Sequence, residues 1–178
     1  MLPTKHAQSI GLSEILAHLG KSHRQTLRAY LALHRQIMSD PSGLTPVECE
    51  MIALVTSGLN RCSFCANVHS ANLLPLLTPP RSAEWVQQLL TDCRSTALSQ
   101  RERALLDYVT QLTLSPGGIG QPDLEKLRTA GLNDVEIEHA TFVSATLNFT
   151  NRVAMIAGAV LSEGVIRGPI SARQTPPA

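Results

Sequence analysis

The sequence has few aromatic residues, few charged residues and no strong excess of charge of either sign. Of its 178 residues, 3% are aromatic and 16% are charged, and the formal net charge at pH 7 is +1. Lysine and arginine form no cluster larger than a pair, so the electrostatic surface that nucleic acids require is missing. We therefore expect no nucleic-acid partner.

Long hydrophobic runs are also absent. The longest apolar stretch, residues 153–161, is short compared with the ~18 residues typical of a transmembrane helix. The N-terminal segment carries Lys5, His6 and Gln8 and contains no apolar run of signal-peptide length. We therefore expect no membrane association and a cytoplasmic location. Cysteines there are more often catalytic, metal-bound or buried than paired in structural disulfides.

Helix signals run through the whole chain, and alternating strand patterns are essentially absent. Capping boxes at Thr45–Glu48, Ser99–Glu102 and Asn133–Glu136 mark three helix starts. A chain of this length buries one substantial core. We predict an all-α protein with a single domain over residues 1–170 and a flexible tail over residues 171–178. The expected helices span about residues 12–19, 22–38, 45–58, 60–74, 82–93, 99–114, 122–130 and 133–161.

Two segments of the chain resemble each other at an offset of 88 residues. Without a gap, Leu44–Asn60 and Leu132–Asn148 are identical at seven of seventeen positions, where chance gives roughly one. Such an internal match indicates a duplicated helical unit. Only the first copy is followed by cysteines, so the chemistry belongs to one half of a shared scaffold. The identical pairs are Leu44/Leu132, Val47/Val135, Glu48/Glu136, Glu50/Glu138, Val55/Val143, Leu59/Leu147 and Asn60/Asn148.

The motif Cys62-x-x-Cys65-x-x-x-His69 is the main candidate for chemistry. On a helix, spacings of three and four residues place the three side chains on one face. With Asn60 as the expected N-cap, Cys62 falls in the first turn, where unpaired N–H groups and the helix dipole favour a thiolate. An imidazole one turn away can accept the thiol proton.

Glu50 is the candidate partner of this histidine. Glu48 is already explained as a capping-box carboxylate, whereas Glu50 falls on the side of its helix shared with Ala53 and Leu54. An unpaired charge is unfavourable there. Because a buried carboxylate that faces a histidine orients the imidazole and tunes its proton affinity, we add Glu50 to the motif as a fourth member of the site.

Two other interpretations of the motif remain open from the residues alone. Zinc would find three ligands in the motif and a fourth in Glu50, but the second ligand pair of a closed structural site is absent. Alternatively, the two cysteines and the histidine pack in the core without any chemistry. Cys49 and Cys93 have no motif partner, and we expect both to be buried thiols.

The residues around the motif resemble the AhpD-like alkylhydroperoxidases of the carboxymuconolactone decarboxylase superfamily. The segment EMIALVTSGLNRCSFCANVHSANL is similar to their core helix pair, and LNFTNRVAMIAG is similar to a later helix of the peroxidase-related branch. The resemblance covers about residues 27–164. It implies an AhpD-like helical bundle that forms homo-oligomers and uses a redox-active cysteine pair, with no other cofactor and no metal.

The resemblance also implies a role for each residue of the site. Cys65 would attack the peroxide and become a sulfenic acid, and Cys62 would resolve it as an intramolecular disulfide. His69 and Glu50 would form the proton relay. The substrate would be a hydroperoxide and the reductant a thiol or a lipoyl-bearing protein. Founding AhpD members carry a histidine in place of Phe64, and true decarboxylases of the superfamily lack the cysteine pair, which disfavours decarboxylation.

The sequence thus predicts a thiol-dependent peroxidase that reduces alkyl hydroperoxides, or a dithiol–disulfide oxidoreductase. Its antioxidant chemistry would need the cysteine pair and the Glu/His relay together. The alternatives are a zinc-stabilised scaffold or binding protein that uses the same motif, and a redox sensor that binds a partner protein.

Polar residues on the last expected helix have a structural and a functional interpretation. For Asn148, Asn151 and Arg152 we favour hydrogen bonds to a neighbouring helix, or a salt bridge from Arg152 to Glu138 or Glu50. The functional alternative is a polar edge to the peroxide pocket.

The remaining histidines lack ligand spacing with one another. We expect His139 to be structural or to lie at an interface, and the other four to be surface or packing residues. Those four are His6, His18, His23 and His34.

Overall fold

The computed structural model describes residues 12–41, 43–94 and 96–161. Within them the chain is helical and contains no strand, which confirms the all-α prediction. No helix of this part is both long and apolar enough to cross a bilayer. The predicted tail and residues 162–170 of the predicted domain lie outside the described residues. The helices are α1 (Leu12–Ser22), α2 (Arg24–Met38), α3 (Pro46–Leu59), α4 (Ser63–Leu73), α5 (Ala83–Thr91), α6 (Gln100–Leu114), α7 (Gln121–Thr129) and α8 (Asp134–Leu161), with short 3-10 turns at Leu74–Leu76 and Pro116–Gly118.

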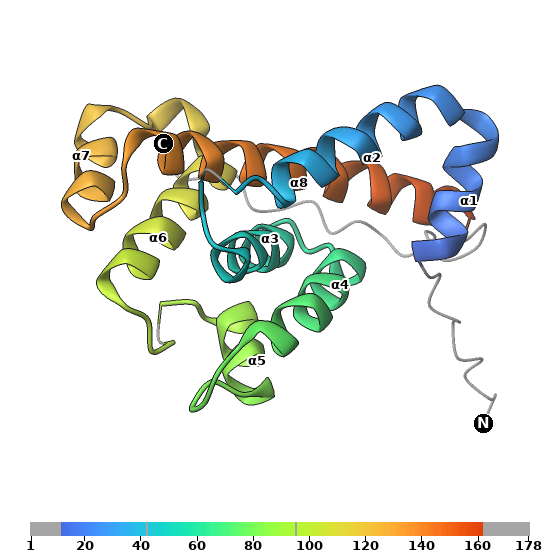
Figure 1. The fold of residues 1–178 in the computed structure, drawn as a ribbon. Helices are drawn as coiled ribbons and strands as arrows, with labels where there is room; N and C mark the ends of the chain where they lie inside the picture. The colour runs from blue at the N-terminus through green and yellow to red at the C-terminus, as the bar shows by residue number, and fades with distance from the viewer. Residues whose placement is uncertain (1–11, 42, 95, 162–178) are drawn as a thin grey trace, which may run out of the picture.

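Helix α3 lies at the centre of the fold (Figure 1). It packs against α4, α5, α6 and α8. Between residues 48 and 57, only Glu50 keeps partial exposure, and every other residue is buried. A helix that is covered on all sides in this way belongs in the middle of a bundle. Helix α2 runs along α8, and α1 packs against both of them (Figure 1).

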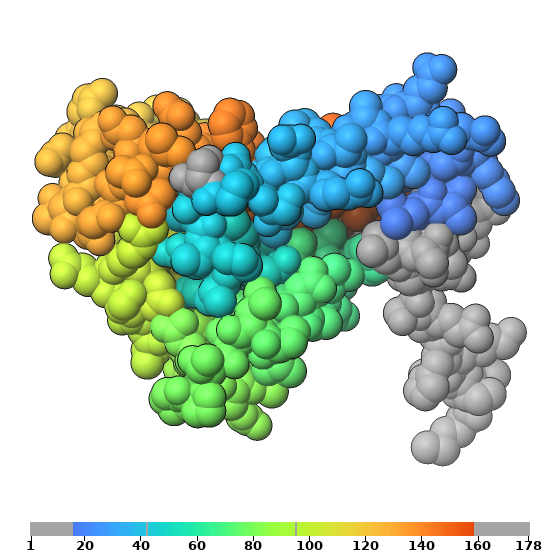
Figure 2. Space-filling model, in the orientation of Figure 1, coloured from blue at the N-terminus to red at the C-terminus, as the bar shows by residue number. Residues whose placement is uncertain are grey.

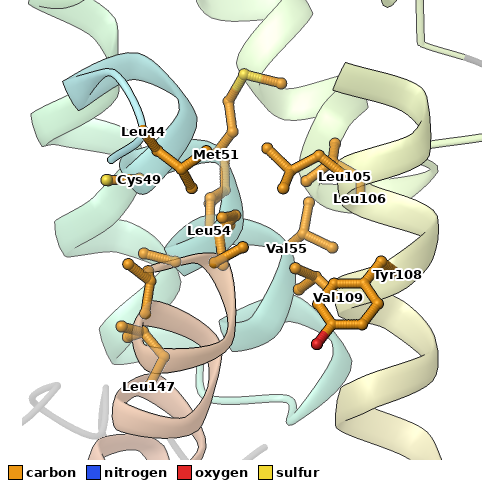
Figure 3. Packing of buried hydrophobic residues seen from close by; sticks show 14 of the residues in the cluster. Leu44, Cys49, Met51, Leu54, Val55, Leu105, Leu106, Tyr108, Val109 and Leu147 are labelled. Carbon is orange, nitrogen blue, oxygen red and sulfur yellow. The ribbon is translucent and has the colours of Figure 1, made fainter. Parts of the chain in front are cut away.

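Apolar side chains of α3, α6 and α8 form the part of the hydrophobic core seen in Figure 3, and α2, α4, α5 and α7 add further buried residues to it. Burial of one such side chain stabilises the fold by about 1.5–3 kcal/mol. The contacts hold α3, the helix that carries Glu50, between two other helices. Core residues seen in Figure 3 are Met51, Leu54, Val55, Leu105, Leu106, Val109 and Leu147.

Arg101 joins two of the predicted capping boxes. Its Nε donates to Glu48 Oε1 at 2.7 Å, and its Nη2 donates to Glu136 Oε1 at 2.7 Å. These carboxylates also accept hydrogen bonds from the N-cap backbone N–H groups of Thr45 and Asn133. One guanidinium therefore fastens the first turns of α3 and α8 to α6. All three predicted capping boxes form, since Ser99 and Glu102 cap α6 in the same way.

Asparagines join the other ends of the two repeated segments. Asn60 Nδ2 donates to Asn148 Oδ1 at 3.0 Å, and Ser57 Oγ donates to Asn151 Oδ1 at 3.3 Å. Asn148 and Asn151 therefore bond across helices, as the structural interpretation predicted. The expected salt bridge of Arg152 is wrong: its Nη1 donates to the backbone oxygen and Oδ1 of Asn148, one turn earlier on α8.

A sharp turn connects α3 to α4. Arg61 adopts a left-handed conformation with φ of 57°. Its N–H donates to Gly58 O at 2.9 Å, and Cys62 N–H donates to Ser57 O at 2.9 Å. This pair of bonds is the Schellman motif that ends many helices. Asn60 is thus the C-cap of α3 rather than the N-cap of α4, which corrects our sequence-based assignment.

Candidate active site

Glu50 and His69 meet between α3 and α4, as the sequence predicted. Glu50 Oε2 lies 2.8 Å from His69 Nδ1, and the two side chains are 13% and 7% exposed. A carboxylate can only accept, so Nδ1 carries the donated proton, and a neutral imidazole then keeps Nε2 as an acceptor. The pair is therefore arranged to take a proton at Nε2 of the histidine.

Asn72 is a member of this group that the sequence interpretation did not include. Its Nδ2 donates to Glu50 Oε1 at 3.4 Å, so each carboxylate oxygen has a partner. Asn72 follows His69 by three residues on α4, and that spacing places both on one helix face. The spacing was a usable signal, because an amide on the same face as a buried ion pair can complete its hydrogen bonds.

Cys62 and Cys65 lie at the start of α4. Cys62 is the N-cap residue itself and Cys65 is in the first turn. The helix thus begins two residues later than expected from an N-cap at Asn60. Both are free thiols, 2% and 3% exposed, and they pack with Ala154 of α8. Phe64 packs against this small cluster. An aromatic side chain thus contacts the cluster from the position where founding AhpD members have a histidine.

The two thiols share their protons unequally. The Cys65 side chain, as hydrogen-bond donor, lowers the pKa of Cys62 to about 7, although burial acts in the opposite direction. The same interaction raises the pKa of Cys65, and burial adds to the increase. The pair therefore loses one proton easily and retains the second. The position of Cys62 at a helix N-terminus is one where thiolates are commonly found.

Tyr30 and Thr150 add a hydroxyl pair that the sequence did not reveal. Their oxygens are 2.5 Å apart, and Thr150 Oγ1 also donates to the backbone oxygen of Thr146 at 2.7 Å. Because a threonine hydroxyl has one proton, Tyr30 must be the donor of the shared bond. The pKa of Tyr30 is raised overall, mainly by burial. The hydrogen bond to Thr150 lowers it in part, and the nearby Cys65 adds to the increase.

His34 lies one turn after Tyr30 on α2, and their rings meet edge to face at 5.7 Å. Burial lowers the pKa of His34, and the neighbouring His69 lowers it further, while Glu50 raises it. We expected a surface or packing residue, but His34 belongs to the surroundings of the proposed relay. No spacing rule could have connected α2 to this site, because the contact is tertiary.

A cavity of about 970 Å³ opens onto these residues. Its walls come from α1, α2, α4 and α8, together with Glu50 of α3, and they include Cys65 and His69. Cys62 is not among the described residues that line it. Of the two thiols, Cys65 is thus the one that a ligand in the cavity would meet.

Cys49, Cys93 and His139 lie outside this site, whereas His18 and His23 are among the residues that line the cavity. Cys49 is buried, and burial raises its pKa to about 12. Cys93 is only half-buried, so the expectation for it was partly wrong. His139 is structural, because Nδ1 accepts from Leu44 N–H at 2.9 Å and Nε2 donates to Ile37 O at 2.7 Å.

The described residues do not favour the zinc interpretation of the motif. Within residues 12–41, 43–94 and 96–161, no three histidine, cysteine, aspartate or glutamate side chains are grouped as metal ligands. Glu50, the candidate fourth ligand, is already bonded to His69 and Asn72. Both oxygens of the Glu50 carboxylate are therefore engaged in hydrogen bonds to side chains.

The model of the carboxymuconolactone decarboxylase family matches residues 24–111, which include all four proposed site residues. Among solved structures, a peroxidase-related protein from Silicibacter sp. TM1040 is 26% identical, with a TM-score of 0.70 over 88% of this chain and 93% of its own. The chain belongs to the AhpD-like carboxymuconolactone decarboxylase superfamily.

Two further solved structures resemble this AhpD-like chain. A peroxidase-related protein with an alkylhydroperoxidase AhpD core from Ralstonia eutropha JMP134 is 27% identical, with a TM-score of 0.72 over 77% of this chain and 70% of its own. A protein of unknown function from Agrobacterium tumefaciens, a candidate AhpD antioxidant defence protein, is 28% identical, with a TM-score of 0.65 over 76% of this chain and 90% of its own. No curated protein matches the sequence.

Proposed function

We propose that this AhpD-like protein is a thiol peroxidase that reduces alkyl hydroperoxides through Cys62 and Cys65. The observation that supports the proposal most directly is the buried contact of 2.8 Å between His69 and Glu50, on the helix that begins at the cysteine pair. Membership of the superfamily suggests a peroxidase-related enzyme, and the geometry supports the finer assignment.

In the first step, the Cys65 sulfur attacks the terminal oxygen of the hydroperoxide. The proton shared by the two thiols moves to Cys62, so that Cys65 reacts as the thiolate. An S–O bond forms and the O–O bond breaks, which gives a sulfenic acid on Cys65. The departing alkoxide takes a proton and leaves as the alcohol. Cys65 is assigned this role because it lines the cavity and Cys62 does not.

In the second step, Cys62 attacks the sulfenic sulfur of Cys65. An S–S bond forms and the S–O bond breaks, and the departing hydroxide takes a proton to become water. Over both steps two thiols are oxidised to one disulfide, while the hydroperoxide is reduced to an alcohol and water. Cys62 must lose its proton before it attacks, because the thiolate is the attacking form.

The His69–Glu50 pair moves the protons in this scheme. Nε2 of His69 accepts a proton when a thiol ionises and returns it to the alkoxide or to the hydroxide. Glu50 stabilises the imidazolium that forms for an instant, and Asn72 holds the carboxylate in place. The dry surroundings of the pair strengthen these interactions.

A reductant, either a thiol or a lipoyl-bearing protein, would return the disulfide to two thiols by exchange.

We also propose a homo-oligomer in the cytoplasm. Large apolar side chains on α2 and α8 support the oligomer, since Leu33 and Phe142 are 56% and 60% exposed. Exposed apolar residues in such numbers are typical of surfaces that partners cover.

Thiol titration tests the proposal. Reduced protein is mixed with one equivalent of cumene hydroperoxide, and free thiols are counted before and after. We expect two of the four cysteines to disappear and peptide mapping to show a Cys62–Cys65 disulfide. Replacement of Cys49 by serine should leave this result intact, and replacement of Cys65 should abolish it. Thiols that react no faster than free cysteine would refute the assignment.

The redox-sensor alternative keeps the same disulfide but needs no turnover. Steady-state assays with dithiothreitol, dihydrolipoamide and reduced glutathione distinguish the two functions. A peroxidase consumes many equivalents of hydroperoxide with at least one reductant, whereas a sensor stops after one.

A further inference from the structure

The cavity is far larger than the peroxide group that reacts in it. Its volume of about 970 Å³ lies at the upper end of the ~300–1,000 Å³ range of small-molecule sites. A hydroperoxide group has only two oxygen atoms. The remaining space must therefore accommodate the organic part of the substrate. In Figure 2, α1 and α2 project from the helical core as a blue arm, and part of α8 is visible between α2 and α4.

The cavity is elongated along α2. Its lining on that side begins at His23 and ends at Ser39, which at 1.5 Å per residue is roughly 24 Å of helix. Tyr30 lies near the middle of this length, where it bonds to Thr150 beside the Cys65 thiol. The wall on either side of Tyr30 is mostly hydrocarbon. It includes Leu19, Leu27, Leu31, Val153, Ile156 and Ala157.

Among the described residues of the wall, the charged side chains are nearly all basic. Glu50 is the only carboxylate of this described set, and it is engaged by His69 and Asn72. Two guanidinium groups, those of Arg35 and Arg152, also line the cavity. Within the described part of the chain, neither has a carboxylate within salt-bridge distance.

An elongated apolar cavity, lined by guanidinium groups that have no carboxylate partner among the described residues, is complementary to an amphipathic anion. The hydrocarbon wall favours a long aliphatic chain by the hydrophobic effect. The arginines favour a carboxylate, with which a guanidinium can form two parallel hydrogen bonds. Neutral small peroxides gain nothing from either feature.

We infer that the substrate is the hydroperoxide of a long-chain carboxylic acid, whose chain fills the cavity while Arg35 or Arg152 binds its carboxylate. The inference rests on the proposed peroxidase function and specifies its substrate class. The chemistry is that of the two steps above: two thiols become a disulfide, and the chain hydroperoxide becomes a chain alcohol and water.

Kinetic discrimination tests the inference. The value of kcat/KM is measured for linoleic acid hydroperoxide, its methyl ester and tert-butyl hydroperoxide. We expect the acid to exceed the ester about tenfold and tert-butyl hydroperoxide by more. Raising the salt concentration should narrow the difference between acid and ester, because ions screen exposed charges. Equal values for all three substrates would overturn the inference and leave the peroxidase function standing.

Matched variants on α2 locate the site. Leu27→Trp fills part of the cavity. We expect it to lower the ratio of kcat/KM for linoleic acid hydroperoxide to kcat/KM for tert-butyl hydroperoxide at least tenfold. Leu33→Trp, on the same helix but outside the lining, should leave that ratio unchanged.

The arginines are tested by Arg35→Gln on α2 and Arg152→Gln on α8. Arg28→Gln is the control, because Arg28 lies on α2 but not in the lining. At least one of the variants Arg35→Gln and Arg152→Gln should lose the preference for the acid over the ester. If both variants keep that preference, the proposed role of the arginines is overturned.

Binding without reaction separates this inference from the proposed function. Reduced protein is titrated with hexadecanoate and with its methyl ester in a calorimeter. We expect saturable binding of the acid and weaker binding of the ester, even in a Cys65→Ser variant. If no hydroperoxide is reduced but hexadecanoate binds, the peroxidase proposal fails and the cavity assignment stands. If hydroperoxides are reduced and hexadecanoate does not bind, the reverse holds.

Discussion

Asn60 donates a hydrogen bond of 3.0 Å to Asn148, the residue that occupies the equivalent position 88 residues later in the internal repeat. At the other end of the same helices, Arg101 binds the equivalent carboxylates Glu48 and Glu136. Corresponding residues of the two copies thus meet each other or share one partner. The copies differ where chemistry is proposed: Glu50 contacts His69, whereas its counterpart Glu138 is exposed.

Replacement of Arg101 by methionine should destabilise the protein by about 2–4 kcal/mol, because Glu48 is buried and would lose its counter-ion. Urea unfolding followed by circular dichroism measures the change. Arg128→Met is the control, since its pairs with Glu125 and Asp134 are exposed and screened by solvent, so that their loss should change the stability much less. Equal losses for the two variants would contradict the role of Arg101 as a bridge.

Replacement of Glu50 by glutamine should lower the rate of peroxide reduction about 10²-fold. The amide keeps a hydrogen-bond acceptor for His69 but no charge to stabilise an imidazolium, and general acid–base catalysis contributes about 10²–10⁴-fold. Stopped-flow measurement of thiol oxidation gives the rate, and circular dichroism checks the fold. Glu138→Gln, at the equivalent position of the second copy, should react like the unmodified protein. A normal rate for Glu50→Gln would rule out the relay.

Alkylation of Cys62 should depend on pH with a midpoint near 7. Its pKa is lowered to about 7, so the reactive thiolate predominates above that pH and is lost below it. The rate of iodoacetamide labelling, resolved by peptide mass spectrometry, gives the profile. Cys65→Ala removes the side chain that stabilises the thiolate and should move the midpoint upward. Cys49, whose pKa is raised to about 12, should stay unlabelled over this range.

Replacement of Tyr30 by phenylalanine should reduce kcat/KM for organic hydroperoxides about tenfold. The Tyr30 oxygen donates its proton to Thr150 and keeps a lone pair that can accept from the O–H of a hydroperoxide. Tyr108→Phe is a close control, because its hydroxyl contacts Thr141 at 2.8 Å in the same manner but does not line the cavity. A similar decrease in both variants would indicate a general packing effect.

Replacement of Arg61 by glycine should stabilise the protein by about 0.5–1 kcal/mol. A residue with a side chain is disfavoured at φ of 57°, whereas glycine adopts that conformation freely. Glycine already occupies the equivalent turn after α7, where Gly131 has φ of 92° and its N–H donates to Arg128 O. Thermal unfolding measures the change, and a lower melting temperature for Arg61→Gly would show that the arginine side chain stabilises the turn.

Local patterns in the sequence determined the helices and the pairing of Glu50 with His69 in the proposed site. Capping boxes, prolines and glycines act within a few residues, so the starts of α3, α6 and α8 could be predicted closely. The pairing of Glu50 with His69 followed from helical spacing and from the unfavourable burial of an unpaired carboxylate. These forces operate within one helix or between two consecutive helices.

Only the tertiary structure decided which distant residues meet. Tyr30 and Thr150 are 120 residues apart and touch because α2 packs along α8, so the sequence carried no signal for their contact with the cavity. Asn60 has a better N-capping side chain than Cys62, but it serves as the C-cap of α3. The turn at Arg61, closed by two backbone hydrogen bonds to the end of α3, then leaves Cys62 as the N-cap of α4. Local preference fixes where helices form, and packing across the core decides which of their faces share a cavity.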